Sequence, residues 1–366
     1  MEKEKKDLLY SLVIAVVMFG LTVICWLKPA DAFSATERRK LEQFPKISLE
    51  TIFDGSFMKD FEEYSLDQFP FRDEFRSIKS VFHKYVLGQM DNNGVYIAEE
   101  SLSEMDAEFS EKALAHAMQK ITSIYDTYMK DTQVKVYTSV IPDKNYFLAE
   151  KNGYPSYDYE TLYTYVKESL GFAENIEIRD LLSIEDYYRT DTHWKQQNIL
   201  DVAQRLAERM DVPLGAVYKE VKLDIPFYGV YYGQLALPIE PDKITYLEQD
   251  LFSDCVIYDY ENQKEIPMYD LELAAGRDGY EMFLSGSLSV ITIENPNAAT
   301  EKELVIFRDS FGSSIAPLLV EGYQKITILD IRYLNEKMIG NFVEFSNQDV
   351  LFLYSTSVLN NESSFR

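Results

Sequence analysis

The sequence predicts an α/β protein in which a parallel sheet is flanked by helices, with a β-rich insertion and one N-terminal transmembrane helix. Three observations indicate this fold class. Short apolar runs with strand character alternate with segments whose apolar residues recur at helical spacing, as in strand–helix–strand units. Residues 213–300 interrupt this alternation with short β-rich runs. An uncharged stretch of 20 residues, Leu8 to Leu27, is long enough to cross a bilayer core.

Residues 1–32 are expected to be an uncleaved membrane anchor. Lys3, Lys5 and Lys6 precede the apolar stretch, which favours a cytoplasmic N-terminus and an extracytoplasmic remainder. Basic residues soon after the stretch weaken this charge signal. A cleavable signal peptide is the alternative, because Ala30-Asp31-Ala32 resembles a cleavage site, and the protein would then be secreted.

The remaining elements follow in order. Residues 33–90 form a charged, partly helical arm that breaks at Pro70, and residues 91–366 form the main domain, with the insertion at about 213–300. Strands are expected at 95–98, 134–141, 176–179, 256–260, 288–293, 304–307, 325–329 and 350–354. Helices are expected at 103–129, 159–170, 195–210 and 313–320.

Composition excludes some functions. The 366 residues carry 61 acidic and 36 basic side chains, a formal charge of -25, and such a surface repels the phosphate backbone of a nucleic acid. Of the two cysteines, Cys25 lies inside the apolar stretch, so no disulfide with Cys255 is expected.

Three residues in two motifs carry the chemistry that the sequence suggests. His193 lies in Thr190-Asp191-Thr192-His193-Trp194, and Ser310 follows the apolar run at 304–307, where a strand would give way to a helix. A serine hydroxyl is a weak nucleophile until a base removes its proton, and an aspartate can fix the imidazole tautomer that does so. Positions i and i+2 of an extended segment point the same way, so Asp191 can reach His193. The first amides of the following helix would stabilise an oxyanion.

The same residues have a simpler structural interpretation. Asp191-Thr192 could cap a helix that begins near Trp194, and Asp309-Ser310 could be an ordinary N-cap. The spacing alone does not decide between capping and catalysis. The other histidines, His83 and His116, look like structural or surface residues, and no cluster has the spacing of metal ligands.

The motif from Thr190 to Trp194, together with Asp309-Ser310-Phe311, resembles the DHHW family, which is similar to the alginate O-acetyltransferases AlgJ and AlgX. Further matching segments are the anchor, Asp67 to Asp73, Asn93-Gly94-Val95-Tyr96, Pro142-Asp143-Lys144 and Asp330-Ile331-Arg332-Tyr333. The resemblance implies an SGNH-hydrolase-like fold with Ser310 as nucleophile, His193 as base and Asp191 as orienting acid. In that group the Asp-x-His pair precedes the serine, as it does in this chain.

The chain departs from the pattern at two positions. Thr192 stands where the family name has its first histidine, and Arg308 precedes Asp309-Ser310 where SGNH enzymes often have glycine. An arginine there could alter the oxyanion pocket. Asn295 and Asn297 are candidates for the auxiliary asparagine of SGNH enzymes.

Five further residues are candidates for contacts with substrate. Gly233 is a candidate oxyanion amide, with a tight turn as the alternative, and Trp194 is a candidate platform for sugar stacking, with packing as the alternative. Arg332, Tyr333 and Lys144 follow predicted strand ends, where open α/β sheets place ligand sites. For Arg332 a structural salt bridge is the competing role.

The sequence therefore predicts a membrane-anchored, extracytoplasmic O-acetyltransferase of a cell-surface or secreted polysaccharide, acting through an acetyl-serine intermediate without a cofactor. The resemblance implies a multispanning membrane-bound O-acyltransferase as acetyl donor and a polysaccharide hydroxyl as acceptor. The anchor would raise the effective concentration of serine near the donor. A carbohydrate acetylesterase with the same triad and a non-catalytic glycan-binding or assembly component are the alternatives.

Overall fold

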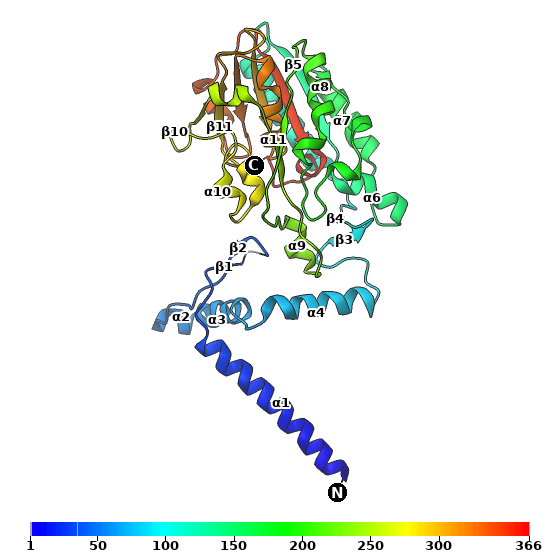
Figure 1. Ribbon diagram of the computed structural model, residues 1–366, viewed down its shortest axis with the longest axis vertical. Helices are drawn as coiled ribbons and strands as arrows, with labels where there is room; N and C mark the ends of the chain where they lie inside the picture. The colour runs from blue at the N-terminus through cyan, green and yellow to red at the C-terminus, as the bar shows by residue number, and fades with distance from the viewer. Residues whose placement is uncertain (1, 35, 366) are drawn as a thin grey trace. The chain divides into compact units, whose positions relative to one another are not determined.

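The computed structural model describes residues 2–34 and 36–365, and the chain divides into two compact units (Figure 1). The N-terminal unit contains the residues up to Asn92 together with Gly233–Ile239, and the C-terminal unit contains the rest. The segment Gly233–Ile239 falls within the β-rich insertion of the sequence, so its place in the N-terminal unit was not expected.

The N-terminal unit begins with helix α1 (Glu2–Leu27). Within the described residues, Lys5–Leu27 is the one helical stretch long and apolar enough to cross a membrane, and none of it is buried. A membrane anchor and a signal sequence both have this length and composition.

Three shorter helices complete the N-terminal unit: α2 (Leu49–Phe53), α3 (Ser56–Asp67) and α4 (Arg72–Tyr85). The two-residue strands β1 (Phe33–Ser34) and β2 (Arg39–Lys40) pair antiparallel. As expected, the chain breaks at Pro70, between α3 and α4. Ion pairs hold this unit together, since the guanidinium of Arg39 donates to both carboxylate oxygens of Asp67.

An eight-stranded sheet forms the centre of the C-terminal unit, in the order β10-β9-β11-β13-β12-β14-β5-β6. The last five of these strands are mutually parallel, whereas β11 runs antiparallel to β13 and β9, and β10 antiparallel to β9. The strands are β5 (Lys135–Ile141), β6 (Glu174–Asn175), β9 (Val256–Asp259), β10 (Lys264–Glu265), β11 (Val290–Glu294), β12 (Glu303–Arg308), β13 (Lys325–Leu329) and β14 (Asp349–Ser355).

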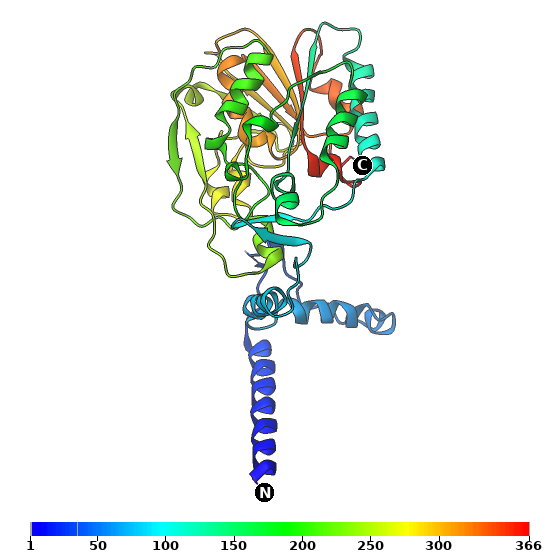
Figure 2. The same cartoon turned by 90° about the vertical axis from the view of Figure 1, so that its right-hand side faces the viewer.

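Helices cover both faces of this sheet, as the two views show (Figures 1 and 2). Helices α8 (Leu200–Arg209) and α11 (Gly312–Leu319) pack on one face, and α5 (Glu111–Tyr128) and α7 (Tyr159–Ser169) on the other. Strand β12 shows why: Leu304 and Ile306 belong to the first apolar cluster, and Val305 and Phe307 to the second. A strand buried on both faces reads as a continuous apolar run.

Smaller elements surround the sheet. Two antiparallel pairs are β3 (Val95–Ala98) with β4 (Ser101–Glu104), and β7 (Lys219–Lys222) with β8 (Thr245–Glu248). The short helices of this unit are α6 (Lys144–Asn152), α10 (Leu271–Ala274) and α12 (Thr356–Leu359), and α9 (Val230–Leu235) begins in this unit and ends in the N-terminal one. Single 3₁₀ turns lie at Arg179–Leu181, Ile184–Asp186, Gln196–Asn198, Asp250–Asp254, Gly279–Met282, Val320–Gly322 and Glu336–Asn341.

The predicted α/β class, a mostly parallel sheet between helical layers, is confirmed, and three element predictions need correction. The strand expected at 176–179 is wrong, because the pairing with β5 occurs at Glu174–Asn175. The helix expected from 103 begins at Glu111, since the Ser110 side chain caps it by accepting from the Ala113 amide. Within the insertion, β9, β10 and β11 extend the central sheet in antiparallel fashion, so the sheet is mixed.

Candidate active site

Ser310 lies directly after β12, at the edge where the parallel strands end. The buried carboxylate of Asp309 fixes the turn: one oxygen accepts the Phe311 amide at 3.0 Å, and the other accepts the amide and hydroxyl of Ser355, both at 2.7 Å. Ser355 ends the neighbouring strand β14. Asp309 therefore ties two strand ends together, and it leaves Ser310 half-buried at the start of α11.

His193 connects Ser310 to Asp191. Its Nδ1 lies 2.6 Å from Oδ1 of Asp191, and its Nε2 lies 2.7 Å from the Ser310 hydroxyl oxygen. A carboxylate can only accept, so Nδ1 carries the proton and Nε2 is free to accept from the serine hydroxyl. The imidazole is 7% exposed and Asp191 is fully buried, which excludes most competing water. The structure thus brings together the three residues that the sequence singled out.

Asp191 is held by backbone amides as well as by the imidazole. Its Oδ1 accepts the His193 amide at 3.0 Å, and its Oδ2 accepts the Val230 amide at 2.9 Å. Gly229, just before, passes so close that a Cβ there would lie 2.2 Å from the Thr190 carbonyl oxygen and 2.4 Å from Cβ of Asp191. The capping interpretation of Asp191 explains only the first of these contacts, and nothing in the sequence pattern pointed to Gly229 or Val230.

Asp242 also stabilises the loop that carries Asp191. Its carboxylate accepts the amides of Arg189 and Thr190 at 3.0 and 2.7 Å, and the Thr190 hydroxyl at 2.6 Å. The Thr190 hydroxyl in turn accepts the Gly229 amide at 3.0 Å. The loop that carries Asp191 is therefore fixed by hydrogen bonds on both sides, as a preorganised site requires.

Aromatic side chains set the plane of the imidazole. The Tyr280 ring stacks on His193 at a centroid distance of 3.8 Å and an interplanar angle of 8°, and Phe311 packs beside it at 4.9 Å. The Tyr280 hydroxyl lies 2.7 Å from the Ser314 hydroxyl oxygen, and burial raises the pKa of Tyr280, which keeps the phenol protonated. Tyr280 lies in a 3₁₀ turn that is far from both motifs along the chain, and no local pattern pointed to its position.

The oxyanion donors differ from the expectation. The Phe311 amide donates to Asp309 Oδ1, and the Gly312 amide to the Asp309 carbonyl at 3.0 Å, so these first amides at the start of α11 are engaged within the turn. Among the described residues the amide of Ser310 itself has no hydrogen-bond acceptor, which makes it the available donor for an oxyanion on the attacked carbon.

Lys144 is a positioning residue in this structure, not a substrate contact. It is 1% exposed, and its ammonium donates to the carbonyls of Tyr188, Arg189 and Asp191 at 2.7, 3.0 and 3.1 Å. These three acceptors match its three donors. Burial lowers the pKa of Lys144 to about 7. Lys144 therefore holds the backbone carbonyls of the loop that carries Asp191 in place.

Trp194 is also a packing residue rather than a sugar platform. Its indole is fully buried, and its Nε1 donates to the Ser314 hydroxyl at 2.8 Å. Its ring meets Phe311 edge to face at 5.3 Å. A buried ring cannot stack on a saccharide.

Three other candidates have partners other than the serine. Gly233 belongs to the N-terminal unit, where its carbonyl accepts from Arg76 and a Cβ would lie 2.1 Å from the Thr36 carbonyl oxygen, so the oxyanion role is not supported. The Asn295 amide donates to the Val320 carbonyl at 2.8 Å, and Asn297 donates to Asp254 at 2.8 Å. Both asparagines act as turn residues.

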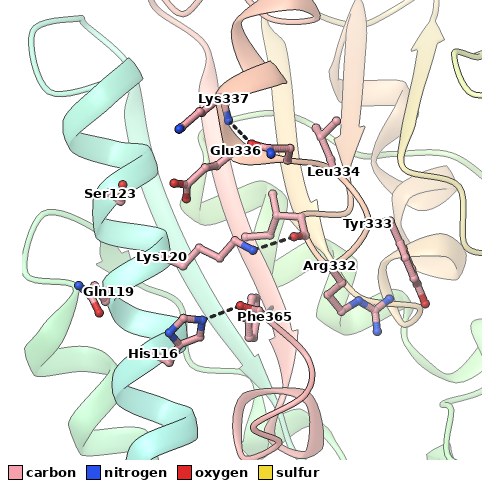
Figure 3. A pocket seen from close by; sticks show the side chains of 12 residues that line it. His116, Gln119, Lys120, Ser123, Arg332, Tyr333, Leu334, Glu336, Lys337 and Phe365 are labelled. Carbon is pink, nitrogen blue, oxygen red and sulfur yellow. Dashed lines mark hydrogen bonds between the residues drawn. The ribbon is translucent and has the colours of Figure 1, made fainter.

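Arg332 and Tyr333 line a cavity of about 630 Å³ between the loop after β13 and α5 (Figure 3). Arg332 donates to both carboxylate oxygens of Asp330, at 2.9 and 2.6 Å, which is the structural salt bridge that competed with a ligand role. Tyr333 is 62% exposed. Ser310 does not line this cavity, so its lining residues are neighbours of the site rather than part of it.

Arg308 is completely buried beneath the start of α11. Its guanidinium donates to the Gly286 carbonyl at 3.1 Å and lies 3.6 Å from a carboxylate oxygen of Asp330. A Cβ at Gly312 would lie 2.5 Å from Cβ of Arg308, so the arginine and Gly312 fit each other. The charge therefore points into the sheet edge beside β13.

Among the described residues no group of three or more His, Cys, Asp or Glu side chains could hold a metal.

Known structures share this architecture. A DHHW family protein from Eubacterium siraeum matches with a TM-score of 0.61 and 21% identity over 75% of this chain and 94% of its own. PatB1 of Bacillus cereus, solved with a sulfonyl adduct, matches with a TM-score of 0.59 and 19% identity over 74% and 98%. The O-acetyltransferase domain of Pseudomonas putida AlgJ is more distant, with a TM-score of 0.43, 13% identity and coverage of 75% and 95%.

No protein-family model matches the chain, and no curated protein is similar to it in sequence. The fold that the DHHW resemblance implies is nevertheless the fold found here, because the likeness to the Eubacterium siraeum protein and to PatB1 spans about three quarters of this chain and nearly all of theirs. The chain is thus similar in architecture to a DHHW family protein, with an Asp191–His193–Ser310 constellation at the sheet edge.

Proposed function

We propose that this chain is a membrane-anchored, extracytoplasmic O-acetyltransferase of a cell-surface or secreted polysaccharide. One observation carries the proposal: the continuous hydrogen-bonded chain from the Ser310 hydroxyl through His193 to the buried Asp191, with 2.7 and 2.6 Å separations. The order of the motifs and the similarity of the fold to a DHHW family protein support the acyl-transfer class.

The reaction would proceed in two half-steps. The Ser310 oxygen attacks the carbonyl carbon of an acetyl ester while Nε2 of His193 takes its proton, and the Ser310 amide donates to the resulting oxyanion. Collapse breaks the bond to the donor oxygen, which leaves with the proton from His193 and gives acetyl-serine. A sugar hydroxyl then loses its proton to His193 and attacks the acetyl carbon. Ser310 leaves, regains that proton and is restored.

The anchor explains why such a serine is tethered. An acetyl group carried across the membrane by a multispanning acyltransferase would reach the extracytoplasmic face, and α1 would hold the serine at that face. Hydrolysis differs only in that water replaces the sugar hydroxyl in the second half-step.

The test uses the purified full-length chain with an acetyl ester reporter. Ser310→Ala should lower turnover by about 10³-fold or more, because the nucleophile is lost. Ser313→Ala is the matched control, since this buried serine lies three residues on and the ring nitrogens of His193 bond to Asp191 and Ser310 instead. A sulfonyl fluoride should label the wild type and the control but not the Ser310→Ala variant.

An oligosaccharide acceptor separates the outcomes. Acetyl gained by the oligosaccharide supports the proposal, and release of acetate alone would identify an esterase. A wild-type chain with no turnover and no acetyl or sulfonyl adduct would contradict catalysis and leave a glycan-binding or assembly role.

A further inference from the structure

The N-terminal unit has an unusual surface. Seventeen large apolar side chains between Phe44 and Met90 are exposed, whereas the whole C-terminal unit exposes seven. Scattered apolar residues on a surface need no explanation, but a dense set on a short segment marks a contact with another apolar phase.

Helix α4 organises the most regular part of this surface. Five apolar residues follow one another at alternating spacings of four and three, which places them on one narrow face of the helix. Each of them is at least 45% exposed: Phe71, Phe75, Ile78, Phe82 and Tyr85, here called the α4 stripe.

The opposite face of α4 packs on the rest of its own unit. Arg76 pairs with Glu37 at 3.0 Å and donates to the Gly233 carbonyl, and the buried Ser80 accepts from Asn92 at 2.8 Å. These contacts fix the rotation of α4 about its axis. The α4 stripe consequently points away from the protein.

The beginning of the α4 stripe lies beside the end of α1. Ile24 and Lys28, at the end of α1, line the same cavity of about 430 Å³ as Phe69, Phe71 and Arg72. Both views show α4 running crosswise to α1 (Figures 1 and 2). A helix that lies beside the end of a membrane span and runs crosswise to it follows the membrane surface.

We propose that α4 lies in the interfacial layer of the membrane that α1 crosses, with the α4 stripe buried at the boundary between headgroups and acyl chains. Aromatic and aliphatic residues on one face, with basic residues beside it, are typical of such helices. Lys79 lies beside the stripe, from where its ammonium group can reach the headgroups. The proposal rests on α1 crossing the membrane, as proposed above.

The test measures lipid contact in proteoliposomes of phosphatidylcholine that contain the full-length chain alone. Cys25 and Cys255 are replaced by alanine, and one fluorophore is attached at Ile78→Cys, Phe19→Cys or Val217→Cys. Phe19 lies within α1, and Val217 is a 91% exposed apolar residue of the C-terminal unit. Brominated lipids should quench the Ile78 label as they quench the Phe19 label, and at least about twofold more strongly than the Val217 label.

Two quenching results with the otherwise unsubstituted stripe would overturn the proposal, and they differ in what they say about α1. Quenching at Phe19 but not at Ile78 would leave the anchor in place and show that the stripe faces water or another protein. No quenching at either position would remove the anchor itself. A Phe75→Ser/Phe82→Ser variant that carries the Ile78→Cys label should lose the lipid quenching of that label and keep full turnover of a soluble acetyl ester, because no stripe residue lies in the catalytic unit. Unchanged quenching of the Ile78 label in this variant would also overturn the proposal.

Discussion

The two units of this chain place their apolar side chains in opposite ways. The C-terminal unit buries its apolar residues in clusters on both faces of the sheet and fixes a polar triad at the sheet edge. The N-terminal unit leaves its apolar residues outside and is held together by ion pairs, such as Arg39 with Asp67 and Arg72 with Glu37. Apolar surface is stabilised where water is excluded from it. The C-terminal unit excludes water within its own core, whereas the apolar surface of the N-terminal unit needs a separate apolar phase, which we propose is the membrane.

This comparison predicts that changes in each unit have different consequences. Substitutions around the triad should alter chemistry and stability without changing membrane contact. Substitutions in the N-terminal unit should alter membrane contact or the stability of that unit without changing the chemistry.

The largest effect is expected from Asp191→Asn. The carboxylate accepts from His193 Nδ1 and from two backbone amides, and an asparagine must turn its own NH₂ toward one of them. The imidazole then loses the tautomer that accepts from Ser310, and turnover of the acetyl ester should fall by about 10³–10⁴-fold. The thermal midpoint should fall, because a buried donor loses its acceptor, and the lipid quenching at Ile78 should change little. A fall of less than about tenfold would reduce Asp191 to a capping residue.

Gly229→Ala should damage both stability and turnover. The new Cβ would overlap the backbone of Thr190, which cannot move without shifting Asp191, and overpacking of this kind costs about 1–3 kcal/mol. Gly171→Ala is the control, since its Cβ would meet its nearest neighbour at 3.9 Å and should be neutral. Denaturant unfolding and ester turnover measure both quantities, and equal behaviour of the two variants would contradict the close approach.

Lys144→Met should reveal a pH-dependent difference in stability. The native pKa of about 7 lies below that of the lysine in the unfolded chain, so as pH rises above 7 the native state releases its proton before the unfolded state does. The free energy of unfolding of the wild type should therefore rise relative to the variant between about pH 7 and about pH 10. The variant also leaves three buried carbonyls unpaired. A difference between the two proteins that stays constant with pH would contradict the assigned cause.

The smallest effect is expected from Asp67→Asn in the N-terminal unit. The hydrogen bond with Arg39 lowers the pKa of Asp67, so the ion pair stabilises the unit above the unfolded pKa of the carboxyl and is lost as pH falls through the lower native value. The loss should be about 1 kcal/mol, since Arg39 is partly exposed. Hydrogen exchange should be faster in α3 and α4, and ester turnover should be unchanged. Reduced turnover would show that the two units are coupled.

Much of the fold was predictable because each element carries a local signal. The runs at 304–307, 325–329 and 350–354 are apolar on both faces and match β12, β13 and β14 within a residue at each end. Strand β6 was misplaced because two residues paired at an edge leave no periodicity to detect. The serine, histidine and aspartate were identifiable because two of them share one motif and the third follows a strong strand.

The remaining site residues could not be predicted, because their roles depend on contacts between distant segments. Gly229 and Val230 approach Asp191 from 38 and 39 positions away, and Tyr280 stacks on an imidazole 87 positions earlier. Trp194 and Lys144 were candidates for contacts with substrate because of their chemistry, but burial gives them structural roles.

By itself the sequence determined the apolar N-terminal helix, the order of strands and helices, and the three residues with the chemistry of acyl transfer, since these follow from local periodicity and residue type. Only the tertiary structure decided that the three residues meet, that backbone amides and Tyr280 fix their geometry, and that the α4 stripe faces outward. Distances between segments far apart in the chain, and the exposure of a side chain, are set by packing, which no local pattern records.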